Sequence, residues 1–196
     1  MNRTEFILGG QKSGKSRRAE LLARDWLAQS PQHKAVFIAT AQAWDEEMRE
    51  RISRHQRDRA ERVPGMTTEE EPLQLAEAIQ KHSQPDTLVV VDCLTLWLTN
   101  WLMPVESPSM ACKNMANQSA DQSISAQAAT LLISIRAASG PVVLVGNEIG
   151  LGVIPMGAEV RAFVDALGRL NQDVAQACTH VTLMAAGLPL SLKGGV

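Results

Sequence analysis

Short aliphatic runs recur along the chain and alternate with longer, more polar stretches. The runs are Phe6-Ile7-Leu8 and residues 35–39, 88–91, 142–145 and 181–184. Continuous apolarity is typical of strands that are covered on both faces, as in a parallel sheet. The stretches between them predict helices at about 15–28, 45–60, 72–83, 124–138 and 158–177, and residues 188–193 predict a last edge strand. We therefore expect an α/β doubly wound fold with a mainly parallel sheet, in which ligands bind beyond the carboxyl ends of the strands.

Length, charge and composition exclude several classes of protein. The 196 residues have an ordinary globular composition and predict a single domain spanning 1–196, and the net charge of −2 gives no reason to expect nucleic acid as a partner. No apolar run approaches the roughly 18 residues of a membrane span, and no signal peptide is evident, so we expect a cytoplasmic protein. Three distant cysteines predict neither a disulfide framework nor a zinc site. Residues 104–127, rich in Ser, Gln and Asn, predict an exposed or mobile insertion or, alternatively, a lid.

The strongest local signal is the glycine-rich segment that follows the first aliphatic run. Glycines let the backbone turn tightly so that successive N–H groups converge on an anion, and the helix N-terminus beyond them adds favourable partial charge. In such a segment Lys15 reaches the β- and γ-phosphates of a nucleotide, and the Ser16 hydroxyl ligates Mg²⁺. The segment therefore predicts a nucleoside triphosphate site. It fits the pattern G-x-x-x-x-G-K-[ST] and reads Gly9-Gly10-Gln11-Lys12-Ser13-Gly14-Lys15-Ser16.

A carboxylate at the end of a neighbouring strand usually completes a magnesium site of this kind. Asp92 ends the run 88–91 and fits that role, although an aspartate there could instead cap the helix that begins near Leu94. Glu148, just beyond the run 142–145, is a second candidate. The sequence thus favours Mg²⁺ held by Ser16 and Asp92.

Six arginines and one histidine, His55, lie between residues 49 and 62. Glu47, Arg51, His55 and Arg59 are spaced by four, so a helix would carry them as one stripe. The stripe is compatible with a solvated face of Glu–Arg pairs. It is also compatible with catalysis, because a neutral imidazole is nucleophilic and neighbouring guanidinium groups disfavour its protonation and bind phosphate oxygens. In that second interpretation His55 attacks a nucleotide α-phosphate.

Together these features resemble the bifunctional adenosylcobinamide kinase/adenosylcobinamide-phosphate guanylyltransferase family of cobalamin biosynthesis. The segments that carry the resemblance span nearly the whole chain. The glycine-rich segment is common to many families, and the combination with the other motifs is more specific. Besides the glycine-rich segment, the resemblance rests on Ile38-Ala39-Thr40-Ala41, Asp45-Glu46-Glu47-Met48, Arg51-Ile52-Ser53-Arg54-His55, Glu70-Glu71-Pro72, Val91-Asp92-Cys93-Leu94-Thr95, Asn147-Glu148-Ile149-Gly150-Leu151-Gly152 and Gly168-Arg169-Leu170-Asn171-Gln172.

The resemblance implies a P-loop, RecA-like fold, a homotrimer and two reactions. ATP or GTP phosphorylates adenosylcobinamide, and GTP then guanylylates the phosphate through a GMP–histidine intermediate at the position that matches His55. Lys15 is the second residue with an implied catalytic role. The implied nucleotide contacts are Gly9, Gly10, Gln11, Lys12, Ser13, Gly14, Lys15, Ser16, Ala39, Thr40, Ala41, Gln56, Arg57, Asp58, Arg59, Glu70 and Asp92.

Several motif residues have plainer explanations. Asn147 and Glu148 could belong only to a glycine-assisted turn, and Asn171 and Gln172 could be exposed helix residues. Gly168 interrupts a predicted helix at a cost of about 1 kcal/mol, which favours close packing at that point.

Two other functions remain compatible with the residues. One is a small-molecule kinase in which His55 is only structural. The other is a RecA-like ATPase or nucleotide-gated binding module whose arginine cluster contacts nucleic acid or protein. Acidic flanks and the absence of aromatic residues within the cluster argue against nucleic acid.

Overall fold

The computed structural model describes residues 3–43, 46–103, 116–153 and 155–195. In this part of the chain seven strands form one sheet in the order β3-β2-β4-β5-β1-β6-β7. All neighbours pair in parallel except β6 and β7, so the predicted doubly wound, mainly parallel fold and the predicted edge strand at 188–193 are confirmed. The strands are β1 (Thr4–Gly9), β2 (Lys34–Ala39), β3 (Met66–Glu70), β4 (Thr87–Asp92), β5 (Val142–Val145), β6 (His180–Ala185) and β7 (Leu188–Lys193).

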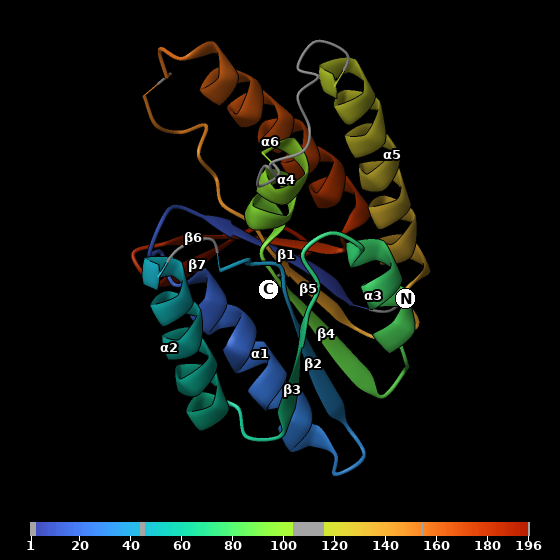
Figure 1. Cartoon of the computed structure of the whole chain (residues 1–196). Coiled ribbons are helices and arrows are strands. Elements are labelled where there is room, and N and C mark those ends of the chain that lie inside the picture. The colour runs from blue at the N-terminus through green and yellow to red at the C-terminus, as the bar shows by residue number, and fades with distance from the viewer. Residues whose placement is uncertain (1–2, 44–45, 104–115, 154, 196) are drawn as a thin grey trace.

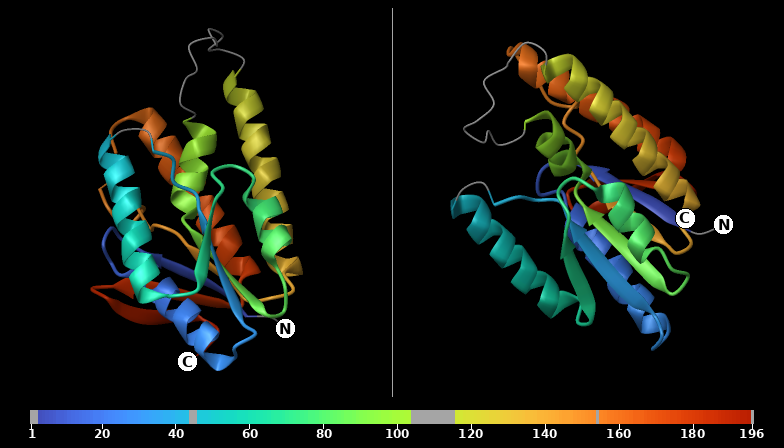
Figure 2. Two further views of the ribbon diagram at one scale, coloured as in Figure 1. Left: turned by 60° about the horizontal axis from the view of Figure 1, so that its bottom comes forward. Right: turned by 45° about the vertical axis from the view of Figure 1, so that its right-hand side comes forward.

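Helices cover both faces of the sheet (Figure 1). One face carries α1 and α2, and the views of Figure 2 show the remaining helices together on the other face. The bounds are α1 (Lys15–Gln29), α2 (Glu46–Arg62), α3 (Leu75–His82), α4 (Leu94–Leu102), α5 (Ala116–Ala137) and α6 (Ala158–Ala177).

Alternate residues of each central strand serve the two faces. In β1, Phe6 and Leu8 pack into the core under α3 to α6, whereas Ile7 packs with Ala19 and Ala23 of α1. All three β1 side chains are buried, which explains why the central strands read as continuous apolar runs.

Three elements differ from the sequence prediction. Strand β3 was not predicted, because it is polar and half exposed at the edge of the sheet. Helix α3 begins at Leu75 rather than at 72, because the Glu71 carboxylate accepts hydrogen bonds from the backbone N–H groups of Leu73 (2.9 Å) and Gln74 (2.7 Å) and forms a turn first. Helix α5 begins at Ala116 instead of about 124. The expected insertion at 104–127 lies partly outside the described residues, and its part from 116 onward forms the first turns of α5.

Candidate functional site: a nucleotide cleft between the phosphate loop and helix α2

The glycine-rich segment connects β1 to α1 in a conformation that requires glycine at its first position. Gly9 has a φ of +153°, and a Cβ there would lie 2.5 Å from the Met184 carbonyl oxygen and 2.6 Å from Ser13 Oγ. Gly14 has a φ of +100° at the N-terminus of α1. The glycine-rich loop is therefore packed tightly against the Met184 carbonyl of β6.

Lys15 and Ser13 supply the buried polar groups of this loop. Lys15 is 9% exposed, and its Nζ donates a hydrogen bond to the Gly10 carbonyl at 2.6 Å. Burial lowers the pKa of Lys15, while the charge of Asp92 acts to raise it. Ser13 Oγ is buried and has no hydrogen-bond partner within the described part of the chain. These groups form a preorganised cradle of the kind that takes phosphate oxygens.

The ends of β2 and β4 are held together by Thr40. Its hydroxyl donates to the Cys93 carbonyl at 2.7 Å and accepts from the Cys93 N–H at 2.8 Å. Asn100 of α4, which is buried, donates to the carbonyls of Thr40 (2.8 Å) and Pro72 (3.0 Å). This network brings Ala39, Ala41 and Asp92 to the wall of the cleft, whereas the Thr40 side chain lies fully buried beneath it.

The donor set of the expected magnesium site is compatible with that ion. Ser16 and Asp92 line the same cleft and offer a hydroxyl and a carboxylate oxygen, and Mg²⁺ usually takes one or two such ligands together with water and phosphate. The N-cap residue of α4 is Cys93, so Asp92 is not the cap of this helix in the described part of the chain. Glu148 is not part of the cleft wall; its carboxylate accepts from the Gly150 N–H at 3.0 Å. Among the described residues no three His, Cys, Asp or Glu side chains gather as a metal site of their own.

Helix α2 is attached beside the sheet mainly through its last turns. Arg59 is 6% exposed, stacks on the Phe37 ring at 3.7 Å and donates to Thr68 Oγ1 at 3.2 Å. Burial lowers the pKa of Arg59, with Glu20 and Asp92 acting in the opposite direction. Arg62 pairs with Glu20 of α1 at 3.0 Å. The predicted stripe is therefore not one solvated face, because Arg59 is turned toward the sheet; the Arg51 side chain lies outside the described part of the structure.

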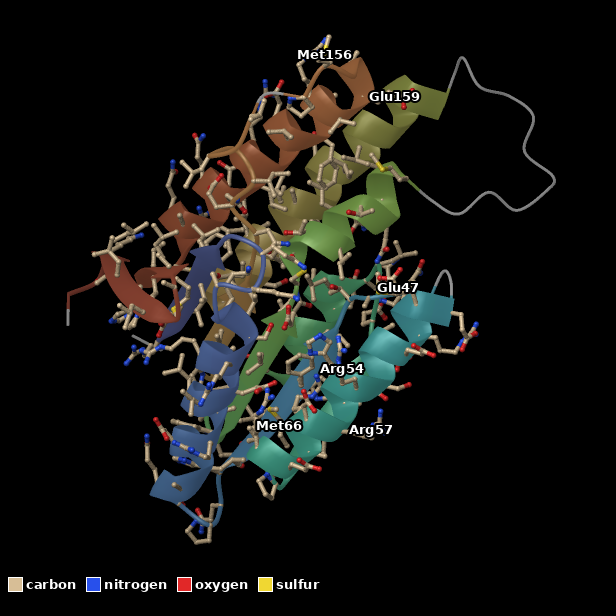
Figure 3. The ribbon with its side chains drawn as sticks, turned by 90° about the vertical axis from the view of Figure 1, so that its left-hand side faces the viewer. Glu47, Arg54, Arg57, Met66, Met156 and Glu159 are labelled. Carbon is tan, nitrogen blue, oxygen red and sulfur yellow. The ribbon has the colours of Figure 1, made fainter. Side chains whose placement is uncertain are left out.

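His55 lies on α2 and is exposed to the cleft, which has a volume of about 1150 Å³. Figure 3 shows α2 beside the sheet, with Arg54 and Arg57 labelled along it and Met66 at the start of β3. Gln56 donates to Glu70 Oε1 at 3.1 Å, which links the helix to the end of β3. The fold thus brings most predicted contacts to one cleft, while Gly9, Gly10 and Thr40 lie outside its lining. The predicted residues that line it are Gln11, Lys12, Ser13, Gly14, Lys15, Ser16, Ala39, Ala41, His55, Gln56, Arg57, Asp58, Arg59, Glu70 and Asp92.

The motif after β5 closes the cleft on another side. Asn147 lines it, and its backbone is fixed on both sides: Asn147 N–H donates to Thr95 Oγ1 at 2.9 Å, and its carbonyl accepts from Asn171 Nδ2 at 3.1 Å. Asn171 is 4% exposed, so the alternative that it is an exposed helix residue is wrong. The expectation of close packing at Gly168 is also wrong, since a Cβ there would meet nothing within 4 Å.

Comparison with known proteins identifies the family. A model of the family described as cobinamide kinase / cobinamide phosphate guanyltransferase matches residues 5–192. The chain belongs to this family. Among its curated relatives, the bifunctional adenosylcobalamin biosynthesis protein CobP of Pseudomonas aeruginosa is 42% identical over 191 residues, covering 97% of each chain. The CobU proteins of Escherichia coli and Salmonella typhimurium are 33% and 32% identical, each covering 96% of this chain and 98% of the relative.

One solved structure shares the overall fold of this chain. The flagellar accessory protein FlaH from Methanocaldococcus jannaschii superposes with a TM-score of 0.50 at 11% identity, covering 99% of this chain and 81% of that one. At this identity the likeness shows a shared overall fold, which agrees with the expected α/β architecture. Across the described ranges, no helix combines the length and apolarity that crossing a membrane requires.

The supporting residues of the site were missed by sequence reasoning. Asn100 and Thr68 contact predicted site residues, and neither belongs to a motif that the sequence analysis singled out. Thr95 lies in the segment Val91–Thr95, but no role was predicted for it. One signal was present for Asn100: it is a polar residue within the apolar run Leu94 to Leu102.

Proposed function

We propose that this chain catalyses both reactions of its family at the cleft between the phosphate loop and α2. The observation that carries the proposal is that Lys15, Ser16, Asp92 and His55 line one cleft although they come from distant parts of the chain. A triphosphate seated on the glycine-rich loop would have its phosphates beside Lys15 and the α2 arginines. The same nucleotide site would then serve a kinase step and a guanylyl-transfer step.

In the kinase step the hydroxyl oxygen of adenosylcobinamide attacks the γ-phosphorus of ATP or GTP. The bond between the γ-phosphorus and the bridging oxygen breaks, the hydroxyl proton is released, and the nucleoside diphosphate leaves. Lys15 and the loop N–H groups hold the phosphates in line and offset their negative charge. Mg²⁺, bound with the nucleotide and held by Ser16 and Asp92, would neutralise charge on the transferred phosphate.

In the guanylyl step His55 is the nucleophile. An unprotonated ring nitrogen attacks the α-phosphorus of GTP, a P–N bond forms, and pyrophosphate leaves. A phosphate oxygen of adenosylcobinamide phosphate then attacks the same phosphorus and releases His55, giving adenosylcobinamide-GDP. The exposure of His55 to the cleft supports this role, because the ring needs no rearrangement of the core to meet a ligand.

We further propose that residues 1–196 act as a single nucleotide-binding domain, that the protein is a homotrimer, and that it works in the cytoplasm. The resemblance to the family supports the trimer. The net charge of −2 supports a small-molecule enzyme rather than a nucleic-acid partner.

Incubation with GTP labelled at the α-phosphate tests the nucleophile. We expect the wild-type protein to retain label after denaturation, in a form that acid releases and alkali does not, as for a phosphoramidate. His55→Ala should retain none, and Ser53→Ala, on the same exposed part of α2, is the matched control and should be labelled normally. An unlabelled wild type that still phosphorylates cobinamide would contradict the guanylyl step and leave a kinase. An unlabelled wild type without kinase activity would contradict both.

A further inference from the structure

A second pocket lies next to the nucleotide cleft. It is an open pocket with a volume of about 550 Å³, bordered by the loop that follows β5 and by one face of α6. This size is within the range of roughly 300–1,000 Å³ that small-molecule sites occupy. The loop contributes Ile149, Gly150 and Val153, and α6 contributes Asp165, Arg169 and Gln172.

Only one residue of the chain, Glu148, separates a residue that lines the cleft from one that lines the pocket. Asn147 lines the cleft and Ile149 lines the pocket, so the two walls are about 8 Å apart at most, given 3.8 Å between consecutive Cα atoms. Between them, the backbone N–H of Glu148 donates to the carbonyl of Gly9 at 3.1 Å, which fastens the loop to the phosphate loop. A ligand in the pocket would therefore lie within reach of a nucleotide in the cleft.

Arg161 holds the far end of the loop against α6. Its Nη1 donates to the Pro155 carbonyl at 3.0 Å and to the Met156 carbonyl. The two segments that form the pocket are thus tied together at the far end by Arg161 and at the near end by the hydrogen bond from Asn171 Nδ2 to the Asn147 carbonyl. Figure 3 shows Met156 standing out beside the start of α6, where Glu159 is labelled.

Gly168 has no structural reason to be glycine. It lies inside α6, where glycine is unfavourable, and it has neither a positive φ nor a neighbour within 4 Å of a Cβ. It lines the pocket. The missing side chain therefore serves to keep the floor of the pocket open, which points to a ligand that occupies this space.

The polar lining is suited to neutral amide groups. Within the described part of the chain, the side chains of Asp165, Arg169 and Gln172 have no hydrogen-bond partner, so they are available to a ligand. A primary amide needs both an acceptor for its NH₂ group and a donor for its carbonyl, and these three side chains supply both. Ile149 and Val153, the latter 96% exposed, add an apolar wall.

We propose that this pocket binds the corrinoid acceptor, taking an edge of the macrocycle with its amide side chains while the arm that carries the hydroxyl extends past Asn147 into the nucleotide cleft. A corrinoid is an apolar ring fringed with primary amides, which matches an apolar wall beside unpaired amide partners. The inference rests on the proposed function and adds the place of the acceptor.

Gly168→Leu tests whether the empty space at Gly168 is needed for cobinamide to bind. Leucine favours a helix more than glycine does, and the space around the Cβ is empty, so the thermal midpoint of the variant should equal or exceed that of the wild type. We expect the variant to bind cobinamide at least about tenfold more weakly in equilibrium dialysis, since its side chain fills the pocket. Gly168→Ala is the matched control: it gains the same helical preference, adds one methyl group and should lose little affinity.

The labelling of His55 by GTP separates this inference from the proposed function, because that half-reaction needs no acceptor. Gly168→Leu should be labelled as well as the wild type. Cobinamide affinity equal to that of the wild type in Gly168→Leu would overturn the inference, even with normal labelling. A change of sedimentation coefficient with unchanged cobinamide affinity would also overturn it and would assign the face to contact between copies of the chain.

Gln172→Leu provides a second measurement that does not depend on Gly168. It keeps the size of an exposed side chain and removes its amide, so cobinamide affinity should fall about three- to tenfold, as for the loss of one hydrogen bond, with GTP affinity unchanged. Equal affinity in both Gln172→Leu and Gly168→Leu would place the acceptor elsewhere.

Discussion

Lys15 places an ammonium group in the buried floor of the phosphate loop, and this affects stability in alkaline solution. Burial lowers its pKa below the ordinary value of 10.5, and the charge of Asp92 offsets part of that effect. The folded state therefore binds this proton less tightly than the unfolded chain does. It follows that the contribution of Lys15 to stability is unfavourable at neutral pH and that stability rises with pH between the lowered pKa and 10.5.

Lys15→Met tests this consequence, because it keeps the length of the side chain and removes the charge. We expect the wild type to gain stability relative to the variant as the pH rises from neutrality toward 10.5, measured by urea unfolding without nucleotide. The comparison between two proteins matters, since burial raises the pKa of Cys93 and Cys178 to about 12 and so destabilises both proteins at alkaline pH. A difference that is constant with pH would contradict the prediction. Kinase turnover of the variant should fall by about 10² or more.

At the scale of single residues, the sequence predicted the groups whose chemistry is local. Lys15, Ser16 and Asp92 are recognisable because a short motif or a strand end defines them. Asn100 could not be found in that way, because it acts on a backbone carbonyl 60 positions away. Thr95 stands in a recognised segment, but its contact with the Asn147 N–H, 52 positions away, could not be read from that segment. Gly168 is recognisable in the sequence as an unusual helix residue, but only the folded structure shows that its side-chain position is empty.

At the scale of elements, α2 stands out because polar contacts rather than apolar burial attach it. Arg59 is its one buried residue among those described, and the helix contributes charged side chains to the cleft. Helices with few buried apolar contacts open more readily than the core does. The attachment of α2 should therefore depend strongly on Arg59.

We expect Arg59→Ala to speed hydrogen exchange of the α2 amides by about tenfold in the ligand-free protein, because it removes the stack on Phe37 and the hydrogen bond to Thr68. Exchange in β1 and β4 should be unchanged. Glu61→Ala, an exposed change on the same helix, is the control and should leave α2 as it is. Equal exchange in the two variants would show that Arg59 does not anchor the helix.

The elements that sequence reasoning missed share a physical cause. Aliphatic runs predicted the five strands that are buried on both faces, whereas β3 reads as polar because it is an edge strand, with Thr67, Thr68 and Glu70 exposed. The start of α5 was placed too late because its first residues are small and polar, so they carry no apolar periodicity. For β3 the structure depends on its pairing with β2, a neighbour that local sequence does not reveal.

At the scale of the whole molecule, strand order decides which motifs meet. β1, β2, β4 and β5 are parallel and central, so the segments that follow them emerge at the same edge of the sheet. This is why the phosphate loop, Ala41, Asp92 and Asn147 reach one cleft across more than half of the sequence. The sequence predicted that these segments emerge at one edge. It could not predict how far α2 stands from the loop, because that spacing depends on Arg59, Phe37 and Glu20 together.

The turn between β6 and β7 also contacts the phosphate loop. The turn between β6 and β7 has positive φ at Ala186 (51°) and Gly187 (80°), and the Gly187 N–H donates to the Ser13 carbonyl at 3.0 Å. The Gly187 Cα lies 3.3 Å from the position of a Cβ at Gly14. The C-terminal hairpin therefore supports the outer side of the loop, although it contributes no residue to the cleft wall.

Gly187→Pro should weaken nucleotide binding by displacing this hairpin from the phosphate loop. Proline has no N–H to donate to Ser13 and cannot adopt a φ of 80°, so the hairpin must move away from the loop. We expect GTP affinity, measured by calorimetry, to fall about tenfold or more, which corresponds to losing one hydrogen bond and the positioning it provides. Gly195→Pro is the matched control, because Gly195 also has a positive φ (65°) and nothing near its side-chain position. Its GTP affinity should equal that of the wild type. Equal losses in the two variants would mean that the effect comes from proline in the C-terminal segment and not from the contact with the loop, whereas loss in Gly187→Pro alone ties the last strand pair to the first functional motif of the chain.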